Sequence, residues 1–169
     1  MVAGGGVFIA LGSNLGDRAR HIHDALRELA AAGDIKVLAC SSLHETEPVD
    51  GPPDAPPFLN AVAEIATGLE PRALLLRMLE IERRHGRERA PGRFSRPLDL
   101  DLLLYHDRCI DEHDLQVPHP RMWQRRFVTD PLSEISDLQR LAARHAPHDS
   151  PAEHPCHVPR PASRPEAVA

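Results

Sequence analysis

The feature that most constrains this chain of 169 residues is a strand with two aspartates. From Leu98 to Leu102, apolar and acidic residues alternate with the period of two that is typical of an extended strand. One face of the strand therefore carries leucines toward a core, and the other carries Asp99 and Asp101 side by side. A strand whose acidic face is merely solvated would show the same alternation, and the alternation alone favours that simpler interpretation.

The segment before these aspartates is rich in arginine, and this changes the interpretation. Its arginines are Arg83, Arg84, Arg87, Arg89, Arg93 and Arg96. Guanidinium groups match phosphate oxygens in shape and charge. Two neighbouring carboxylates that both stay ionised usually need a cation between them, and magnesium prefers oxygen ligands of this kind. The sequence therefore predicts a polyphosphate site with magnesium at Asp99 and Asp101.

Three separate motifs resemble those of a known family. They are Arg87, Arg89 and Arg96 followed by Pro-Leu-Asp-Leu-Asp at residues 97–101, Ile-Ala-Leu-Gly-Ser-Asn-Leu-Gly at residues 9–16, and Val-Pro-His-Pro-Arg-Met at residues 117–122. In these motifs and their order, over about residues 7–135, the chain resembles the hydroxymethyldihydropterin pyrophosphokinases of folate biosynthesis. The resemblance implies an enzyme that transfers the β,γ-diphosphate of ATP to the hydroxymethyl group of 6-hydroxymethyl-7,8-dihydropterin and releases AMP.

The resemblance also implies roles for the charged residues. Asp99 and Asp101 match the residues that bind two magnesium ions with ATP. Arg87 and Arg96 match loop arginines that approach the phosphates, where they would stabilise charge in the transition state. The residues that match the nucleotide side are Glu82, Arg89, Gln116, His119 and Arg125. Local sequence alone allows a simpler interpretation of Glu82, in which a neighbouring arginine neutralises it in the last turn of a helix.

The resemblance places the second substrate as well. A pterin is a flat heterocycle, so its pocket needs aromatic faces above and below and amide groups around the edge. Phe58 and Phe127 match the two family positions that sandwich the ring, and Asn60 matches the side chain that binds its edge. The positions whose backbone completes that edge match Thr46, Glu47 and Val49. Without the resemblance, core packing would be the simpler interpretation for Phe58, Phe127 and Val49.

The chain departs from the family pattern in its arginine loop. Phe94-Ser95-Arg96 is one residue shorter than the usual segment, which has a tryptophan and Gly-Pro before the arginine. The shortened loop leaves a catalytically lapsed relative open as an alternative. Two others are a non-catalytic ferredoxin-like nucleotide-binding module and another magnesium-dependent transferase with an Asp-x-Asp pair. The last would be favoured if Phe58, Asn60 and Phe127 did not converge.

The order of the predicted elements indicates the fold class. Strands are predicted at residues 7–11, 36–46, 60–67 and 98–102, and helices at residues 17–32 and 71–86. This order predicts an α+β fold with a ferredoxin-like βαββαβ antiparallel sheet and helices on one face, and the resemblance implies the same fold. A C-terminal extension follows, with a small element at residues 109–117 and a helix at residues 122–135 that Pro131 breaks.

Composition bounds the domain organisation and the setting. One domain is expected at residues 1–142, followed by a flexible tail rich in histidine and proline at residues 143–169, where large apolar residues are scarce. The net charge of −5 argues against nucleic-acid binding. Three widely spaced cysteines predict no disulfide framework, and no segment suggests secretion or a membrane span. A cytoplasmic monomer is therefore expected.

Overall fold

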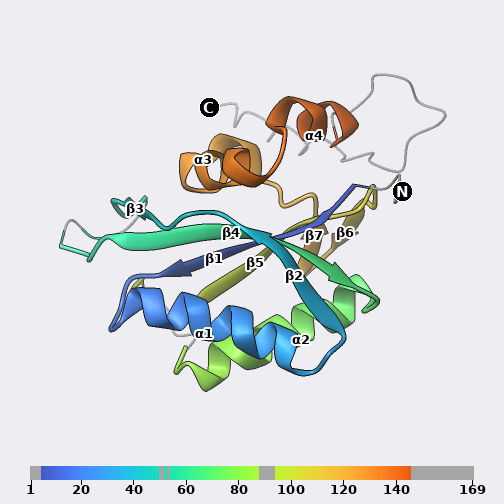
Figure 1. The fold of residues 1–169 in the computed structure, drawn as a ribbon. Helices are drawn as coiled ribbons and strands as arrows, with labels where there is room; N and C mark the ends of the chain where they lie inside the picture. The colour runs from blue at the N-terminus through green and yellow to red at the C-terminus, as the bar shows by residue number, and fades with distance from the viewer. Residues whose placement is uncertain (1–4, 50–51, 53, 88–93, 146–169) are drawn as a thin grey trace, which may run out of the picture.

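A five-stranded antiparallel sheet forms the centre of the computed structural model, which describes residues 5–49, 52, 54–87 and 94–145 (Figure 1). Its strands are β1 (Val7–Ser13), β2 (Ile35–Cys40), β3 (His44–Thr46), β4 (Phe58–Thr67) and β5 (Asp99–Tyr105). The path through the sheet is β2–β4–β1–β5, and β3 also pairs with β4. Strand β1 therefore lies between β4 and β5 and is antiparallel to both.

Two helices cover one face of the sheet and form the main core. They are α1 (Arg18–Ala31) and α2 (Pro71–Arg84), which lie together below the sheet in Figure 1. Apolar residues at helical spacing, such as Leu29 on α1 and Met78 on α2, are fully buried. They belong to one cluster with Ile9, Leu11 and Leu100 of the sheet. The leucine face of β5 thus points into this core, as its alternation predicted.

The C-terminal extension covers part of the opposite face. Its elements are the hairpin β6 (Ile110–Glu112) and β7 (Leu115–Val117), the 3-10 helix η1 (Met122–Gln124), and the helices α3 (Arg126–Ile135) and α4 (Leu138–His145). Val128 and Leu132 of α3 are buried in a second cluster with Phe8 and Val62 of the sheet. The helices predicted at residues 17–32 and 71–86 therefore lie on one face, as expected, and the amphipathic extension buries its apolar side on the other face (Figure 1).

Several predicted boundaries differ from those of the structure. Pro131 lies buried within α3, which continues to Ile135, so the predicted break there is wrong. The helix persists because Leu132, the next residue, is anchored in the second cluster. The predicted strand at residues 36–46 is two strands, since the chain leaves β2 after Cys40 and returns to β4 as β3. Residues 143–145 complete α4, and the rest of the predicted tail lies outside the described residues.

The α+β class with an antiparallel sheet is confirmed, and the ferredoxin-like subtype stays a prediction. Cys40 is a free, exposed thiol, whereas Cys109 is disulfide-bonded, which the spacing of the cysteines did not predict. None of the helices within the described ranges has the length and apolar character that a membrane span requires.

Candidate active site

A pocket of about 280 Å³ lies on the sheet face that also holds α3. Its floor is the middle of the sheet, where β1 contributes Ala10 and Gly12 between two strands with larger side chains. Gly12 pairs with Asn60 of β4 on one side and with Asp99 of β5 on the other. The register thus brings an amide and a carboxylate to the same level of the sheet, on either side of a residue without a side chain.

Gly12 keeps the floor of this pocket open. A methyl group added at Gly12 would lie 3.2 Å from Oδ1 of Asn60, 3.8 Å from the Phe58 ring and 3.9 Å from Cβ of Asp99. The first of these distances is tighter than an ordinary van der Waals contact, so any side chain here would press on Asn60. The glycine therefore makes room above β1 for a ligand that contacts both flanking strands.

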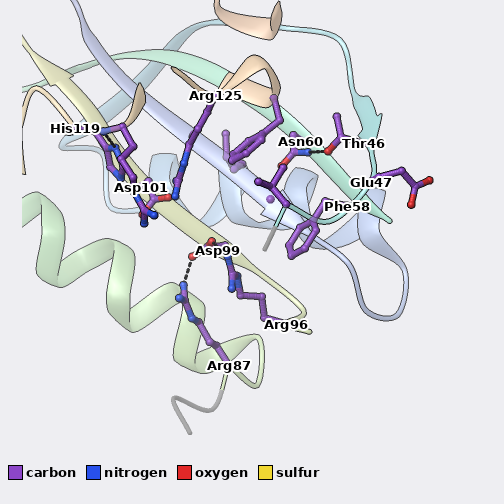
Figure 2. Close-up of a pocket in the computed structure, with 16 residues that line it drawn as sticks. Thr46, Glu47, Phe58, Asn60, Arg87, Arg96, Asp99, Asp101, His119 and Arg125 are labelled. Atoms are coloured by element: carbon purple, nitrogen blue, oxygen red, sulfur yellow. Dashed lines mark hydrogen bonds and ion pairs between the residues drawn. The ribbon is translucent and has the colours of Figure 1, made fainter. Parts of the chain in front are cut away.

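Asp99 and Asp101 both line the pocket, as the alternation along β5 predicted. Asp99 lies between two guanidinium groups: Nη2 of Arg96 is 2.5 Å from its Oδ2, and Nη1 of Arg87 donates to its Oδ1 (Figure 2). Asp101 lies two residues further along the same face of β5. Burial raises its pKa to about 6, and the nearby negative charge of Asp99 adds to the effect, followed by that of Glu82.

Glu82 lies behind this pair rather than in the lining of the pocket. Its side chain is 2% exposed, it accepts the N–H of Leu100 at 2.7 Å, and it forms an ion pair with Arg87. The same Nη1 atom of Arg87 therefore bridges Glu82 and Asp99. This explains an acidic residue near the C-terminal end of α2, where the helix dipole alone would disfavour it. A contact between Glu82 and a nucleotide stays a prediction.

Arg96 has hydrogen-bonding capacity that the protein does not use. Its Nε atom is buried and has no hydrogen-bond partner in the described part of the chain. Such a group is unfavourable unless a ligand satisfies it. The guanidinium carbon also lies 5.3 Å from the centre of the Phe58 ring. Arg96 therefore connects the charged side of the pocket to its aromatic side and offers a free N–H to an incoming oxygen.

Apart from Glu47, which is exposed, neutral residues form the other half of the pocket. Nδ2 of Asn60 donates to Oγ1 of Thr46 at 2.8 Å, because β3 and β4 place Thr46 beside Phe58 in the ladder (Figure 2). Phe58 and Phe127 both line the cavity, and so do Glu47 and Val49. The hydrogen bond fixes the orientation of the Asn60 amide, whose oxygen faces the space above Gly12. This half offers aromatic surface and oriented polar groups to a flat ligand.

His119 and Arg125 lie near Asp101 at the far end of the pocket from Thr46 (Figure 2). Burial lowers the pKa of His119, and the charges of Arg125 and Arg121 lower it further, so the ring is neutral at pH 7. The backbone N–H of Arg121 donates to Nδ1 of His119 at 3.2 Å. Because Nδ1 accepts this bond, the ring proton lies on Nε2, which can donate to a ligand oxygen.

The pocket brings together most of the residues that the sequence predicted for the site. The predicted residues in its lining are Thr46, Glu47, Val49, Phe58, Asn60, Arg87, Arg96, Asp99, Asp101, His119, Arg125 and Phe127. Gln116 instead lies on β7, where its exposed amide donates to Asp111 at 2.8 Å. Arg89 lies outside the described residues.

Four further lining residues were missed by sequence reasoning. They are Ala10, Leu11, Gly12 and Arg121. Ala10 and Gly12 matter because their small size leaves room in the pocket. No local sequence pattern indicates such a role. Arg121 could have been found, since it follows the rigid Pro-His-Pro turn that positions His119. Its pocket-facing position adds another cation to the end that holds His119 and Arg125.

The carboxylate oxygens of the pocket fit a divalent ion that is coordinated partly by the protein and partly by a bound phosphate. Within the described ranges, no group of three or more His, Cys, Asp or Glu side chains is arranged to hold a metal alone. Two adjacent carboxylates do suit magnesium, which keeps several waters and takes further oxygens from a bound phosphate. Burial and the charges of Asp99 and Glu82 raise the pKa of Asp101, and a bound cation would favour its ionised form. Asp99 and Asp101 are therefore the residues that would hold such an ion.

These features define a class of protein: an α+β protein with a pocket whose charged groups suit a polyphosphate and a divalent ion, and whose aromatic and amide groups suit a flat polar molecule. Comparison with known sequences identifies the family. The profile of the 7,8-dihydro-6-hydroxymethylpterin-pyrophosphokinase family matches residues 8–137, and the chain belongs to this family.

Relatives from several organisms agree with this assignment. The chain is 42% identical over 142 residues to 2-amino-4-hydroxy-6-hydroxymethyldihydropteridine pyrophosphokinase of Bacillus subtilis (strain 168), which covers 84% of each chain. It is 42% identical over 132 residues to the protein of the same name in Haemophilus influenzae, with 78% of this chain and 82% of the relative covered. It is also 42% identical over 130 residues to folic acid synthesis protein fol1 of Pneumocystis carinii, where the match covers 77% of this chain but only 17% of that longer protein.

Proposed function

We propose that this protein transfers diphosphate from ATP to the hydroxymethyl group of 6-hydroxymethyl-7,8-dihydropterin and releases AMP, as a step of folate biosynthesis. One observation carries the proposal: a single pocket holds the acidic and arginine residues together with Phe58, Asn60 and Phe127. A transferase with a different acceptor would not need the second group. Their convergence therefore favours the pterin over the alternative of another Asp-x-Asp transferase.

The charged half supports the transfer step. Magnesium bound with ATP, as two ions in this proposal, would screen the triphosphate and orient its β-phosphorus. Asp99 and Asp101 would hold the metal, and the free Nε–H of Arg96 would donate to a phosphate oxygen. Arg87 and Arg96 leave their ion pairs with Asp99 for the phosphates and stabilise the charge of the transition state. No nucleophile from the protein is required, because the pterin hydroxyl attacks directly.

The neutral half supports recognition of the acceptor. Phe58 and Phe127 provide the aromatic faces for the pterin ring, and Asn60, held by Thr46, binds its edge. The backbone at Glu47 and Val49 completes that edge. Arg125 lies 5.3 Å from the Phe127 ring, so it can contact both the ring plane and the nucleotide.

The nucleotide lies toward His119 and Arg125 in this proposal. His119 donates from Nε2, and its neutral form leaves the positive charge to the arginines. Glu82 acts through Arg87, because it pairs with the guanidinium group of that residue. Contacts from Gln116 and Arg89, the cytoplasmic location, the monomeric state and the lack of nucleic-acid binding remain predictions.

The test is formation of AMP from ATP, magnesium and hydroxymethyldihydropterin. The wild type is compared with a double variant, Asp99→Asn with Asp101→Asn, and with Asp24→Asn, a matched control on α1 across the sheet. The proposal expects AMP from the wild type and Asp24→Asn, only when the pterin is present, and none from the double variant. A folded wild type that binds both substrates without forming AMP would indicate a catalytically lapsed relative. Failure to bind either substrate would refute the proposal.

A further inference from the structure

We propose that Asn14 is a positioning residue that fixes the two substrate-binding segments of the pocket relative to each other, an inference that rests on the function proposed above. The arginine segment, residues 94–98, leads into Asp99, and the proline segment, residues 54–57, leads into Phe58. Asn14 follows β1 and does not line the pocket. It is nevertheless 2% exposed, and its polar groups face both segments.

Asn14 pairs with the arginine segment as a strand would. Its backbone N–H donates to the carbonyl of Arg96 at 3.1 Å, and its side-chain Oδ1 accepts the N–H of Arg96 at 2.7 Å. Its Nδ2 also donates to Oγ of Ser95 at 3.3 Å. These bonds continue the β1–β5 ladder, which ends where Gly12 pairs with Asp99. They therefore fix the main chain of Arg96, whose side chain reaches Asp99.

The same amide group holds the proline segment. Nδ2 of Asn14 donates to the carbonyl of Pro56 at 3.2 Å, two residues before Phe58. An asparagine side chain has two N–H donors and one acceptor on a short stem, so it can bond to two segments at once. Aspartate has the acceptor without the donors, and alanine has neither. The bonds of this one buried side chain therefore set the distance between Arg96 and Phe58.

That distance matters because Arg96 and Phe58 meet in the pocket. The guanidinium of Arg96 lies 5.3 Å from the centre of the Phe58 ring and 2.5 Å from Asp99. One of these residues belongs to the phosphate half and the other to the pterin half. A shift of about 1 Å between reacting groups can lower a rate by about 100-fold. Asn14 thus aligns the donor and the acceptor of the diphosphate without touching either.

Arg18 offers a matched comparison. Its Nη1 donates to the carbonyl of Pro57 at 2.8 Å, and its Nη2 bonds to Glu45 of β3 at 2.6 Å. Within the described part of the chain, these bonds hold the proline segment to β3 but do not reach the arginine segment. Removing the Arg18 side chain should therefore loosen the pterin half alone, whereas removing the Asn14 side chain should loosen both halves and their alignment.

The experiment compares Asn14→Ala, Asn14→Asp and Arg18→Ala with the wild type. Amide hydrogen exchange in the free protein should become at least about tenfold faster at Arg96 and around Phe58 in Asn14→Ala, but only around Phe58 in Arg18→Ala. In AMP formation, Asn14→Ala should lower kcat about 100-fold with the KM for ATP within about threefold. Arg18→Ala should raise the KM for the pterin about tenfold and leave kcat within about threefold.

Asn14→Asp keeps the acceptor for Arg96 and loses both donors, so it should retain more kcat than Asn14→Ala while raising the KM for the pterin. It also carries the test if Asn14→Ala does not fold. Equal exchange at Arg96 in Asn14→Ala and Arg18→Ala, a kcat within threefold of the wild type in folded Asn14→Ala, or wild-type exchange around Phe58 in folded Asn14→Asp would overturn the inference while the proposed function stands. A wild type that forms no AMP would instead remove the proposed function and the inference built on it.

Discussion

The two halves of the pocket are held by different kinds of interaction. In the charged half, Asp99 is paired with Arg87 and Arg96, and Asp101 is buried beside it with a pKa raised to about 6. In the neutral half, Asn60 is held by Thr46 through one uncharged hydrogen bond. The charged half therefore stores unfavourable electrostatics that a metal and a phosphate can relieve, whereas the neutral half is already satisfied. The charged half should therefore respond to pH and salt more strongly than the neutral half.

The halves meet because of the strand between them. Strand β4 supplies Phe58 and Asn60, β5 supplies Asp99 and Asp101, and β1 separates them by one strand spacing on each side. Neighbouring strands lie about 4.8 Å apart, so the two flanking strands are about 10 Å apart. That span suits a phosphate chain next to a flat ring. The two halves share this floor. The following predictions test whether a change in one half leaves the binding and stability contributions of the other half unchanged.

The largest effect is expected at the shared floor. Gly12→Val would place branched carbon atoms against Asn60 and close to Asp99, because a single added methyl already lies 3.2 Å from Oδ1 of Asn60. The added atoms would occupy space that both substrates need, so kcat/KM should fall by at least about 100-fold for each. Gly68→Val is the control, since no atom lies within 4 Å of a methyl group added there. Loss of only one substrate's binding would show that the floor is not shared.

Arg87 should matter most for stability. It is the ion-pair partner of Glu82, whose side chain is 2% exposed, so Arg87→Ala leaves a buried carboxylate without this partner. We expect the free energy of unfolding to fall by about 3 kcal/mol, measured by urea denaturation at pH 7. Arg96→Ala is the control: its side chain pairs with Asp99 but is 31% exposed, so the loss should be below about 1 kcal/mol. Equal losses would contradict the bridging role of Arg87.

Asp101 should make stability depend on pH in the charged half. Its pKa in the folded protein, about 6, exceeds the ordinary value of 3.8, so the folded state binds the proton more tightly than the unfolded state. The wild type therefore loses stability as pH rises from about 4 to about 6. Asp101→Asn lacks this loss, so it should exceed the wild type by on the order of 2 kcal/mol at pH 7 and by much less at pH 4. Denaturation without magnesium at pH 4 and pH 7 measures the difference in stability between Asp101→Asn and the wild type. The same difference at both pH values would contradict this role of Asp101.

Asn60 should report on the neutral half alone. Asn60→Ala removes the amide that Thr46 orients, so the KM for the pterin should rise about tenfold while the KM for ATP stays within about twofold. The pterin effect should be the same at low and high potassium chloride, because no charge is removed. Thr46→Val, which removes only the hydroxyl that holds Asn60, should give a smaller change of the same kind. A large change in the KM for ATP would show that the halves are coupled through Asn60.

The sequence predicted the charged half in more detail than the neutral half. Alternation along β5 is a local signal, and it correctly placed Asp99 and Asp101 on one face and the leucines on the other. The convergence of Phe58, Asn60 and Phe127 depends on strand pairing and on the packing of α3, which no local pattern contains. Those residues were predicted only through the family resemblance.

Long-range packing also explains the errors. Pro131 was expected to end its helix, because local rules count the lost hydrogen bond but not the burial of neighbouring residues. The helix at residues 122–135 was predicted, but the sheet face that it covers was not, because that face depends on packing between distant segments. No local signal indicated the roles of Asn14 and Gly12, since these roles depend on segments distant in the sequence that the fold brings beside them.

The smallest effect tests whether the neutral half depends on any charge at all. Glu134 of α3 accepts the N–H and the hydroxyl of Ser42 at 2.7 and 2.8 Å and forms an ion pair with His44 at the start of β3. It thereby ties α3, which carries Phe127, to the strand that carries Thr46. The hydrogen bonds from Ser42, first from its N–H, lower the pKa of Glu134 to about 2.

Glu134→Gln should therefore raise the KM for the pterin only about twofold to threefold, with kcat unchanged, because the group is on the surface and outside the pocket. A lowered carboxyl pKa stabilises the folded state above about 4.5, and this stabilisation is lost as pH falls toward about 2. The urea midpoints of the wild type and Glu134→Gln should thus differ at pH 7 and converge near pH 2. If the variant instead changed kcat, charge outside the pocket would reach the transfer step through α3, and the energetic separation of the two halves would fail.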